Sequence, residues 1–255
     1  DELTVPNTSP DQVPPKKWEQ IKGEAEYVGR KLEKVLEKSR NDSRRSGLTS
    51  GRLDRRQLGK VGLGDPHGFS VDLTGDEKKY DLVFVLDGSG SMRRGKIQTA
   101  TEAIARLSVA AEDIGINVAV TGFRHGRAEL IKPFSVDAEF ARDKLLETDA
   151  GGGTPLAQAL ALARNLLETE SHRGHKPMII TMTDGRPGDV EAVRKELKQT
   201  QAPIQSLTIA TDAKPGNPPE RADELKDYYD GHTYVFEPSR IEQQIDDLVS
   251  QMAGY

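Results

Sequence analysis

The feature that most constrains this chain is a regular alternation of short apolar runs with helical stretches, which begins at residue 80. The run YDLVFVL at residues 80–86 is mostly apolar and has the length of a strand, so it predicts a strand buried on both faces. Residues 95–113 then repeat apolar side chains at helical spacing. Helices between strands imply crossover connections and a mostly parallel sheet. We therefore expect a doubly wound α/β fold with helices flanking the sheet.

The same alternation continues to the end of the chain. Further strands are expected at residues 117–123, 128–131, 178–182, 204–209 and 233–236. Further helices are expected at residues 137–146, 155–170, 190–199, 220–228 and 239–252. We assign residues 76–255 to this one α/β domain.

The segment before residue 76 differs from the α/β domain in composition and in its pattern of apolar residues. Residues 1–15 contain four prolines and predict a flexible end. From residue 16 a helical stripe of apolar side chains begins, which we expect to pack on the α/β domain or on a neighbour. The stripe consists of Trp18, Ile21, Ala25, Val28, Leu32 and Val35. Glycines then break the pattern, with a short helical turn expected at 53–58, so residues 16–75 are predicted to be a helical extension and linker.

Charge and composition narrow the classes of function. Residues 30–60 hold eleven Lys/Arg and four Asp/Glu, whereas the whole chain has a net charge of −5. A basic arm could bind an acidic protein or nucleic acid, but missing aromatic interleaving disfavours nucleic acid. There is no cysteine, which excludes disulfides, thiol catalysis and cysteine-ligated zinc. A cytoplasmic location fits this lack of cysteine. No apolar run approaches the ~20 residues that cross a bilayer, so we expect no transmembrane helix and no membrane partner.

Oxygen-bearing side chains follow the expected strands. Asp87, Ser89 and Ser91 follow the strand at 80–86 at alternate positions, and Asp184 follows the strand at 178–182. Thr154 lies in the glycine-rich loop between them. Ligands of open parallel sheets bind at the carboxyl ends of strands, so we expect these five side chains to converge.

Two carboxylates and three hydroxyls form a donor set of hard oxygens. Such a set suits a hard divalent cation, and Mg²⁺ in particular tolerates bound water and an outside ligand. We therefore expect Mg²⁺, with Mn²⁺ or Ca²⁺ as possible substitutes.

These residues resemble a known pattern. The order Asp87-x-Ser89-x-Ser91, then Thr154, then Asp184, is similar to the metal-ion-dependent adhesion site of von Willebrand factor A (VWA) domains. The resemblance covers about residues 78–252. It implies that the hydroxyls contact the metal, that the aspartates bind it directly or through water, and that a Glu or Asp of a partner protein completes the coordination.

The surrounding sequence resembles particular VWA proteins. The stretches 123–130 (FRHGRAEL), 151–156 (GGGTPL) and 183–187 (TDGRP) look like those of magnesium-chelatase D-type subunits. The segments RRSG at 44–47 and GRLD at 51–54 resemble CobT-type cobaltochelatase subunits. This resemblance implies a partner that is an AAA+ ATPase, in a chelatase-like or MoxR-like complex. The chain has no G-x-x-x-x-G-K-[ST] loop, so ATP hydrolysis is assigned to that partner.

Four arginines lie in or beside the strand-end loops. Arg93, Arg94, Arg124 and Arg186 are expected to steer an acidic partner surface toward the metal. The sequence thus favours a metal-dependent protein-interaction module with no catalytic residues.

Two other functions stay open. A metal-dependent hydrolase would need a general base, for which Asp189 is the best candidate. Alternatively, residues 16–60 could bind nucleic acid with the sheet as scaffold. His172 and His175 form an H-x-x-H pair, but no third ligand is evident, so we interpret them as part of a solvated loop.

Overall fold

The structure is a computed structural model of the 255-residue chain. It describes residues 14–42, 44–48, 52–53, 69–72, 80–184, 187–200, 205–210 and 233–235. The predicted flexible end at 1–13 and the predicted helices at 220–228 and 239–252 lie outside these residues.

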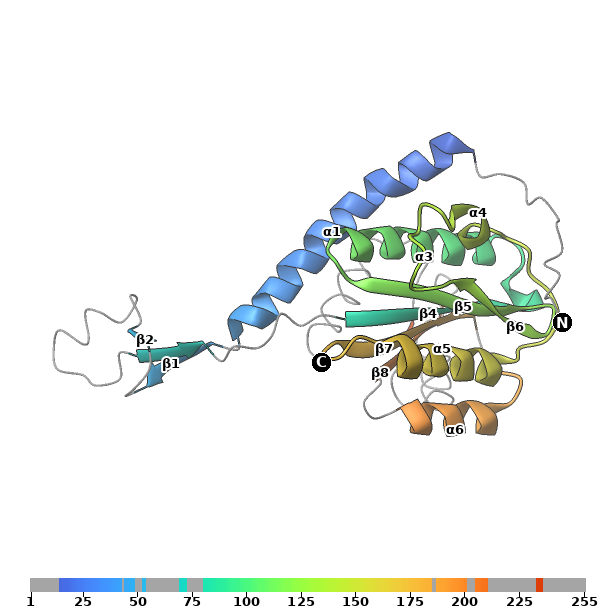
Figure 1. Cartoon of the computed structure of the whole chain (residues 1–255). Coiled ribbons are helices and arrows are strands. Elements are labelled where there is room, and N and C mark those ends of the chain that lie inside the picture. The colour runs from blue at the N-terminus through green and yellow to red at the C-terminus, as the bar shows by residue number, and fades with distance from the viewer. Residues whose placement is uncertain are drawn as a thin grey trace.

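A six-stranded sheet in the order β6-β5-β4-β7-β8-β9 forms the centre of the fold (Figure 1). All neighbouring strands are parallel except β6, which runs antiparallel to β5. The two residues between β5 and β6, His125 and Gly126, both have positive φ, as a tight hairpin turn requires. The strands are β4 (Tyr80–Gly88), β5 (Asn117–Arg124), β6 (Arg127–Lys132), β7 (Lys176–Thr183), β8 (Gln205–Ala210) and β9 (Thr233–Val235). The expected mostly parallel α/β sheet is confirmed.

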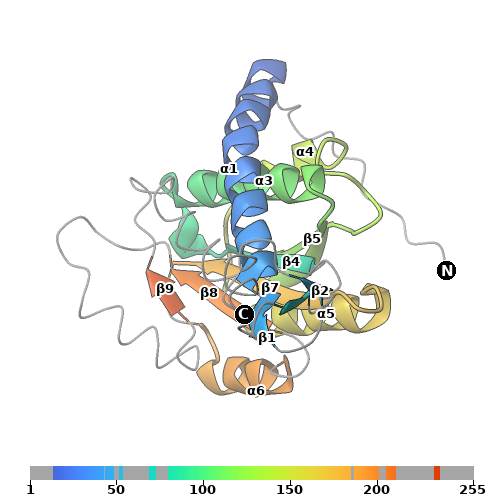
Figure 2. The ribbon, with the colours of Figure 1, turned by 90° about the vertical axis from the view of Figure 1, so that its left-hand side faces the viewer.

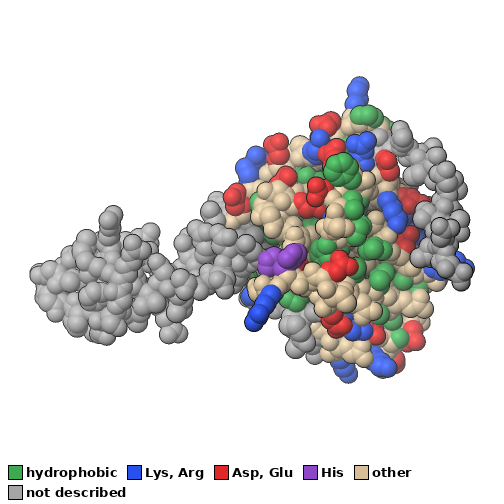
Figure 3. Space-filling model, in the orientation of Figure 1, with side chains coloured by type: hydrophobic (Ala, Val, Ile, Leu, Met, Phe, Trp, Pro, Cys, Tyr) green, Lys and Arg blue, Asp and Glu red, His purple; other side chains and the backbone are tan. Residues whose placement is uncertain are grey.

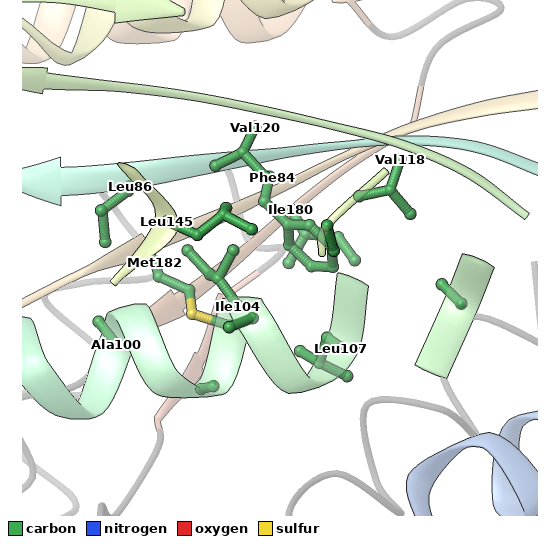
Figure 4. Close-up of a cluster of buried hydrophobic side chains, with 14 of the residues drawn as sticks. Phe84, Leu86, Ala100, Ile104, Leu107, Val118, Val120, Leu145, Ile180 and Met182 are labelled. Atoms are coloured by element: carbon green, nitrogen blue, oxygen red, sulfur yellow. The ribbon is translucent and has the colours of Figure 1, made fainter. Parts of the chain in front are cut away.

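Helices cover both faces of this sheet (Figure 1). The helix α3 (Lys96–Asp113) packs on one face, and α5 (Leu156–Glu170) and α6 (Val190–Thr200) on the other. The central strand β4 is buried throughout, because it packs on both layers. Its Leu82, Phe84 and Leu86 belong to the core under α3, and Val83 and Val85 to the core under α5. Figure 4 shows part of the first core, where Ile104 of α3 is directed toward the sheet.

One predicted helix is largely wrong. Residues 137–146 were expected to be helical, but only the short α4 (Arg142–Leu145) forms, preceded by turns. The Glu112 carboxylate of α3 accepts a 2.9 Å hydrogen bond from the Ala138 backbone N–H. This contact from another element, together with turns at Pro133 and Asp137, sets the path of the chain. Local periodicity could not indicate it.

The N-terminal helix α1 (Pro15–Asp42) lies across α3, as Figures 1 and 2 show from two directions. The stripe packs there as predicted: its buried members are Trp18, Ile21, Ala25 and Val28. The Trp18 indole N–H donates a 2.9 Å hydrogen bond to Glu139. Lys17 and Glu102 form an ion pair of 2.9 Å between the two helices. The side chains of Leu32 and Val35 are outside the described part of the chain.

A second, small sheet follows α1 where the sequence predicted a linker. It has three antiparallel strands in the order β1-β3-β2, namely β1 (Arg44–Leu48), β2 (Arg52–Leu53) and β3 (Phe69–Asp72). Leu53 is therefore in a strand rather than in the expected helical turn, whose other residues, 54–58, are outside the described chain.

Candidate metal site at the carboxyl ends of the strands

The candidate site lies where the neighbouring strands β4 and β7 end. Asp87 is the penultimate residue of β4, and Asp184 follows the last residue of β7. Because the two strands are parallel and adjacent, their carboxyl ends meet at one edge of the sheet. The sheet topology thus brings together residues almost 100 positions apart in the sequence.

Asp87 is the most buried acid of the site, with a relative exposure of 1%. Its Oδ1 accepts the Ser89 backbone N–H at 2.8 Å, and its Oδ2 accepts the Thr183 hydroxyl at 2.6 Å. Burial raises the pKa of the Asp87 carboxyl, and the nearby Asp184 carboxylate adds to the rise, while these hydrogen bonds oppose it. Sequence reasoning did not assign a role to Thr183, although its place at the end of a strand, one residue before Asp184, was a usable signal.

A series of hydrogen bonds through Ser89 and Ser91 connects the two carboxylates. The short 3-10 turn η2 (Gly90–Met92) places Ser89 Oγ 2.9 Å from Ser91 Oγ. The Ser91 hydroxyl donates to Asp184 Oδ1 at 2.7 Å. Four of the five predicted ligands are therefore linked through hydrogen bonds.

The loop that carries the fifth residue, Thr154, is held against this turn by the backbone. The Gly151 N–H donates to Gly88 O at 2.8 Å, and the Gly90 N–H donates to Gly152 O at 3.2 Å. Gly152 has φ of 78°, and a Cβ there would lie 2.6 Å from the backbone of the β5–β6 turn. Only glycine permits this approach, so Gly152 helps to fix the position of the Thr154 loop.

Lys96, the first residue of α3, was missed by the sequence prediction. Its ammonium donates to Asp184 Oδ2 at 2.8 Å, and Asp184 is only 5% exposed. A lysine in the first turn of a helix opposes the helix dipole, so an anionic neighbour is what makes this position favourable. One of the two carboxylates of the site is thus already paired with a positive charge, the Lys96 ammonium.

The donor set fits a hard divalent cation. Two carboxylates and the hydroxyls of Ser89, Ser91 and Thr154 supply only oxygen atoms. Two acids in a buried position are costly without positive charge, and a dication would stabilise their charged forms.

The four predicted partner-contacting arginines differ in exposure. Arg93 and Arg94 are exposed beside the turn, and the Arg93 Nε–H donates to Ala150 O at 2.9 Å. Arg124 is buried and forms ion pairs with Glu129 and Glu147. Arg186 lies outside the described residues.

Asp189, the candidate base for hydrolysis, has a structural partner. Its Oδ1 accepts a 2.9 Å hydrogen bond from the Ala192 backbone N–H, and its carbonyl accepts one from Val193 at 3.2 Å. These contacts cap the start of α6. Helix capping accounts for an acid at this position without any catalytic role.

Comparison with known proteins shows to which family the α/β domain belongs. The model of the von Willebrand factor type A domain family matches residues 82–186. The VWA domain of the pilus tip protein Mfa5 from Porphyromonas gingivalis has the same fold, with a TM-score of 0.56, 14% identity, and coverage of 68% of this chain and 95% of that one. A von Willebrand factor type A protein from Catenulispora acidiphila gives a TM-score of 0.52 at 19% identity, covering 69% of this chain and 43% of that one. The chain contains a VWA domain.

Sequence relatives narrow the resemblance. The chain is 33% identical over 129 residues to the magnesium-chelatase 60 kDa subunit of Cereibacter sphaeroides, covering 51% of this chain and 23% of that protein. It is 35% identical over 111 residues to the uncharacterized protein Rv2850c of Mycobacterium tuberculosis, covering 41% of this chain and 17% of that protein. The match thus spans less than a quarter of either relative. The VWA domain is related in sequence to magnesium-chelatase subunits.

The helices that the structure describes include none long and apolar enough to cross a membrane.

Proposed function

We propose that this chain is a metal-dependent protein-interaction module that binds one Mg²⁺ at the carboxyl edge of its sheet. Asp87, Ser89, Ser91, Thr154 and Asp184 would hold the ion, and Mn²⁺ or Ca²⁺ would serve as substitutes. The observation that carries the proposal is the hydrogen-bonded series from Asp87 through Ser89 and Ser91 to Asp184. It gathers hard oxygen donors from two strands at one point.

Recognition explains this arrangement better than hydrolysis. Hydrolysis requires a base that can reach a metal-activated water, but Asp189 caps a helix instead. A Mg²⁺ ion on neutral hydroxyls and two carboxylates keeps coordination places for outside ligands. A Glu or Asp carboxylate of a partner protein is the natural occupant of such a place.

The proposed partner is an acidic surface of an AAA+ ATPase, in a cytoplasmic chelatase-like or MoxR-like complex. The relationship to magnesium-chelatase subunits supports this setting. Arg93 and Arg94 are exposed beside the turn and would attract an acidic surface over several ångströms. The same charges would make the association weaken with salt.

Calorimetry with Mg²⁺ tests the metal site. Asp87→Ala should abolish binding, because it removes the buried carboxylate that anchors the Ser89 turn. Asp113→Ala is the matched control, since it removes an equal charge from an exposed position at the end of α3. An unchanged magnesium affinity in Asp87→Ala, with the circular dichroism of the folded protein retained, would refute the site.

Capture of the partner tests the interaction. The chain should retain an AAA+ ATPase in Mg²⁺ and release it in chelator or high salt. Ser89→Ala and Thr154→Ala should weaken retention, whereas Thr169→Ala, which removes an exposed hydroxyl from α5, should not. Retention that is indifferent to chelator and to these substitutions would move the interface away from the strand ends.

A further inference from the structure

We propose a second metal site, for a transition-metal dication such as Zn²⁺, formed by Asp81, His172 and His175. It lies at the end of the sheet where the strands β4 and β7 begin, opposite the end that carries the proposed Mg²⁺ site. Asp81 is the second residue of β4, and the two histidines lie in the connection from α5 to β7. Since β4 and β7 are parallel, this edge carries the starts of the strands, whereas the oxygen site lies at their ends. The two sites are therefore separate.

The distances among the three side chains suit a small metal ion. His175 Nδ1 lies 2.8 Å from Asp81 Oδ1, and His172 Nδ1 lies 3.6 Å from the same oxygen. One ligand atom from each of the three residues lies within 4.8 Å of the others. Zinc bonds of about 2.0–2.1 Å in tetrahedral geometry hold ligand atoms about 3.3 Å apart. The two distances to Asp81 Oδ1, 2.8 and 3.6 Å, each lie within about half an ångström of this value. The two imidazole nitrogens lie within 4.8 Å of each other and would adjust to the same spacing when the ion binds.

Asp81 is oriented as a ligand by the backbone and by a hydroxyl. Its Oδ2 accepts the Ser171 hydroxyl and the His172 backbone N–H, both at 2.7 Å. These bonds leave Oδ1 directed toward the imidazoles. Burial would raise the pKa of Asp81, but hydrogen bonds from Ser171, Asn117, His175 and the His172 backbone together hold it below its ordinary value. Outer partners of this kind fix a ligand's orientation at a metal centre.

The place between these ligands is now occupied by hydrogen-bond donors. The Asn117 amide Nδ2 lies 2.7 Å from Asp81 Oδ1 and 3.1 Å from His172 Nδ1. The His175 ring lies within hydrogen-bonding distance of the same carboxylate oxygen. A dication would replace these donors: His175 Nδ1 would give up the proton that now faces Asp81, which leaves to solvent or moves to Nε2, and would bind the ion, while the Asn117 amide would turn away.

The site is open to solvent on one side. The His172 side chain is 60% exposed, and its ring stacks on His175 with centroids 4.9 Å apart. Figure 3 shows histidine side chains gathered at one place on this face of the molecule. An ion can therefore reach the ligands, and water can fill its remaining coordination places.

Two imidazoles and one carboxylate select a borderline transition metal over Mg²⁺ or Ca²⁺. The site would also fasten the connection before β7 to the start of β4. Sequence reasoning dismissed the H-x-x-H pair because its third ligand, Asp81, is 91 residues before His172. Only the sheet brings them together.

Competition for Zn²⁺ against a chromophoric chelator, with the full chain and excess Mg²⁺, tests the proposal. We expect one zinc ion per chain. His172→Ala and His175→Ala should each weaken zinc binding at least about 100-fold. That is the upper end of the loss seen when a residue that only hydrogen-bonds to a metal ligand is replaced, and a direct ligand should matter at least as much. His125→Ala is the matched control, because His125 also pairs with a carboxylate, Asp149, at 2.8 Å, but the described part of the chain gives it no imidazole partner.

Three results would overturn the proposal. The first is an unchanged zinc affinity in the double variant His172→Ala/His175→Ala. The second is an unchanged affinity in a folded Asp81→Asn variant, which would reduce the site to a pair of surface imidazoles. If Asp81→Asn does not fold, zinc-edge X-ray absorption of the unmodified chain decides: two imidazoles bound to zinc are expected, and one or none would refute the site.

Discussion

Replacing Lys96 by methionine should tighten Mg²⁺ binding at the strand-end site. The Lys96 ammonium donates to Asp184 Oδ2 at 2.8 Å, and the Ser91 hydroxyl donates to Oδ1 of the same carboxylate. An incoming dication must either displace this ammonium or bind beside it. Both routes cost free energy, and methionine, which fills a similar volume without charge, removes that cost.

The structure sets the size of the effect. An exposed ion pair contributes about 0.2–1 kcal/mol, whereas a hydrogen bond to a charged group contributes about 1.5–3 kcal/mol. The Lys96 side chain is 31% exposed and that of Asp184 5%, so this pair lies between the two cases. We take about 1–2 kcal/mol, which corresponds to a roughly 5- to 30-fold lower dissociation constant. The folded state should change little, because the lost pair is offset by removing a positive charge from a helix N-terminus.

Isothermal calorimetry with Mg²⁺ measures this change directly. Lys17→Met is the matched control, since Lys17 also forms a 2.9 Å ion pair with a carboxylate, Glu102, and has a similar exposure of 33%. That variant should bind Mg²⁺ like the unmodified chain. An affinity that is unchanged or weaker in Lys96→Met, with Asp87→Ala still abolishing binding, would show that Lys96 holds Asp184 in place rather than competing with the metal.

Three further predictions concern the helix interface and the glycine loop. Trp18→Ala should lower the free energy of unfolding, measured in urea, by about 3–5 kcal/mol, which is the cost of truncating a buried tryptophan. Tyr27→Ala is the control: Tyr27 is 47% exposed on the same helix, and its replacement should lower the free energy of unfolding by less than about 0.5 kcal/mol. Burial alone would raise the pKa of Glu102, but hydrogen bonds from Gln98 and Lys17 and the charge of Arg106 hold it below its ordinary 4.5. The charged Glu102 therefore stabilises the folded state above about pH 4.5, and this stabilisation is lost as the pH falls through its lowered pKa. Between neutral pH and this acidic range, the free energy of unfolding of Glu102→Gln, followed by tryptophan fluorescence, should depend less on pH than that of the unmodified chain. Gly152→Ala should weaken Mg²⁺ binding at least about tenfold in calorimetry, because a Cβ 2.6 Å from the β5–β6 turn pushes the Thr154 loop away; an unchanged affinity would remove Thr154 from the ligand set.

The α/β part of the fold was predictable because apolar residues form short continuous runs in its buried strands but recur every three or four residues in its helices. β4 is apolar on both faces, and its alternate residues enter two different cores, which only a covered central strand can do. The small sheet has no such signal: β1 reads RRSGL, which is neither alternating nor apolar. The helix predicted at residues 137–146 was too long for another reason, since a carboxylate of α3 directs the chain before the short α4.

The candidate sites were predictable to different degrees. The acids and hydroxyls after β4 and β7 were recognisable because strand ends of a parallel sheet share an edge. Lys96 was not, because it is the first residue of the helix α3 rather than a residue directly after a strand, and only the folded structure brings its ammonium to Asp184. The Asp81–His172–His175 group was not either: the H-x-x-H pair is visible in the sequence, but its third member, Asp81, lies at the start of a strand, where no ligand was expected.

The strand-end site, as proposed, ties the affinity for metal to the affinity for partner. A carboxylate from another protein would add an anionic ligand to the ion, so partner and Mg²⁺ would each tighten the binding of the other by the same factor. Lys96 matters in this balance, because it supplies positive charge to Asp184 when no dication is bound and so lowers the free energy gained from metal alone. The exposed Arg93 and Arg94 act in the opposite sense on the partner, which they attract with or without metal. A weak metal site beside a positively charged rim would thus favour the complex in which ion and acidic partner are bound together over either one bound alone.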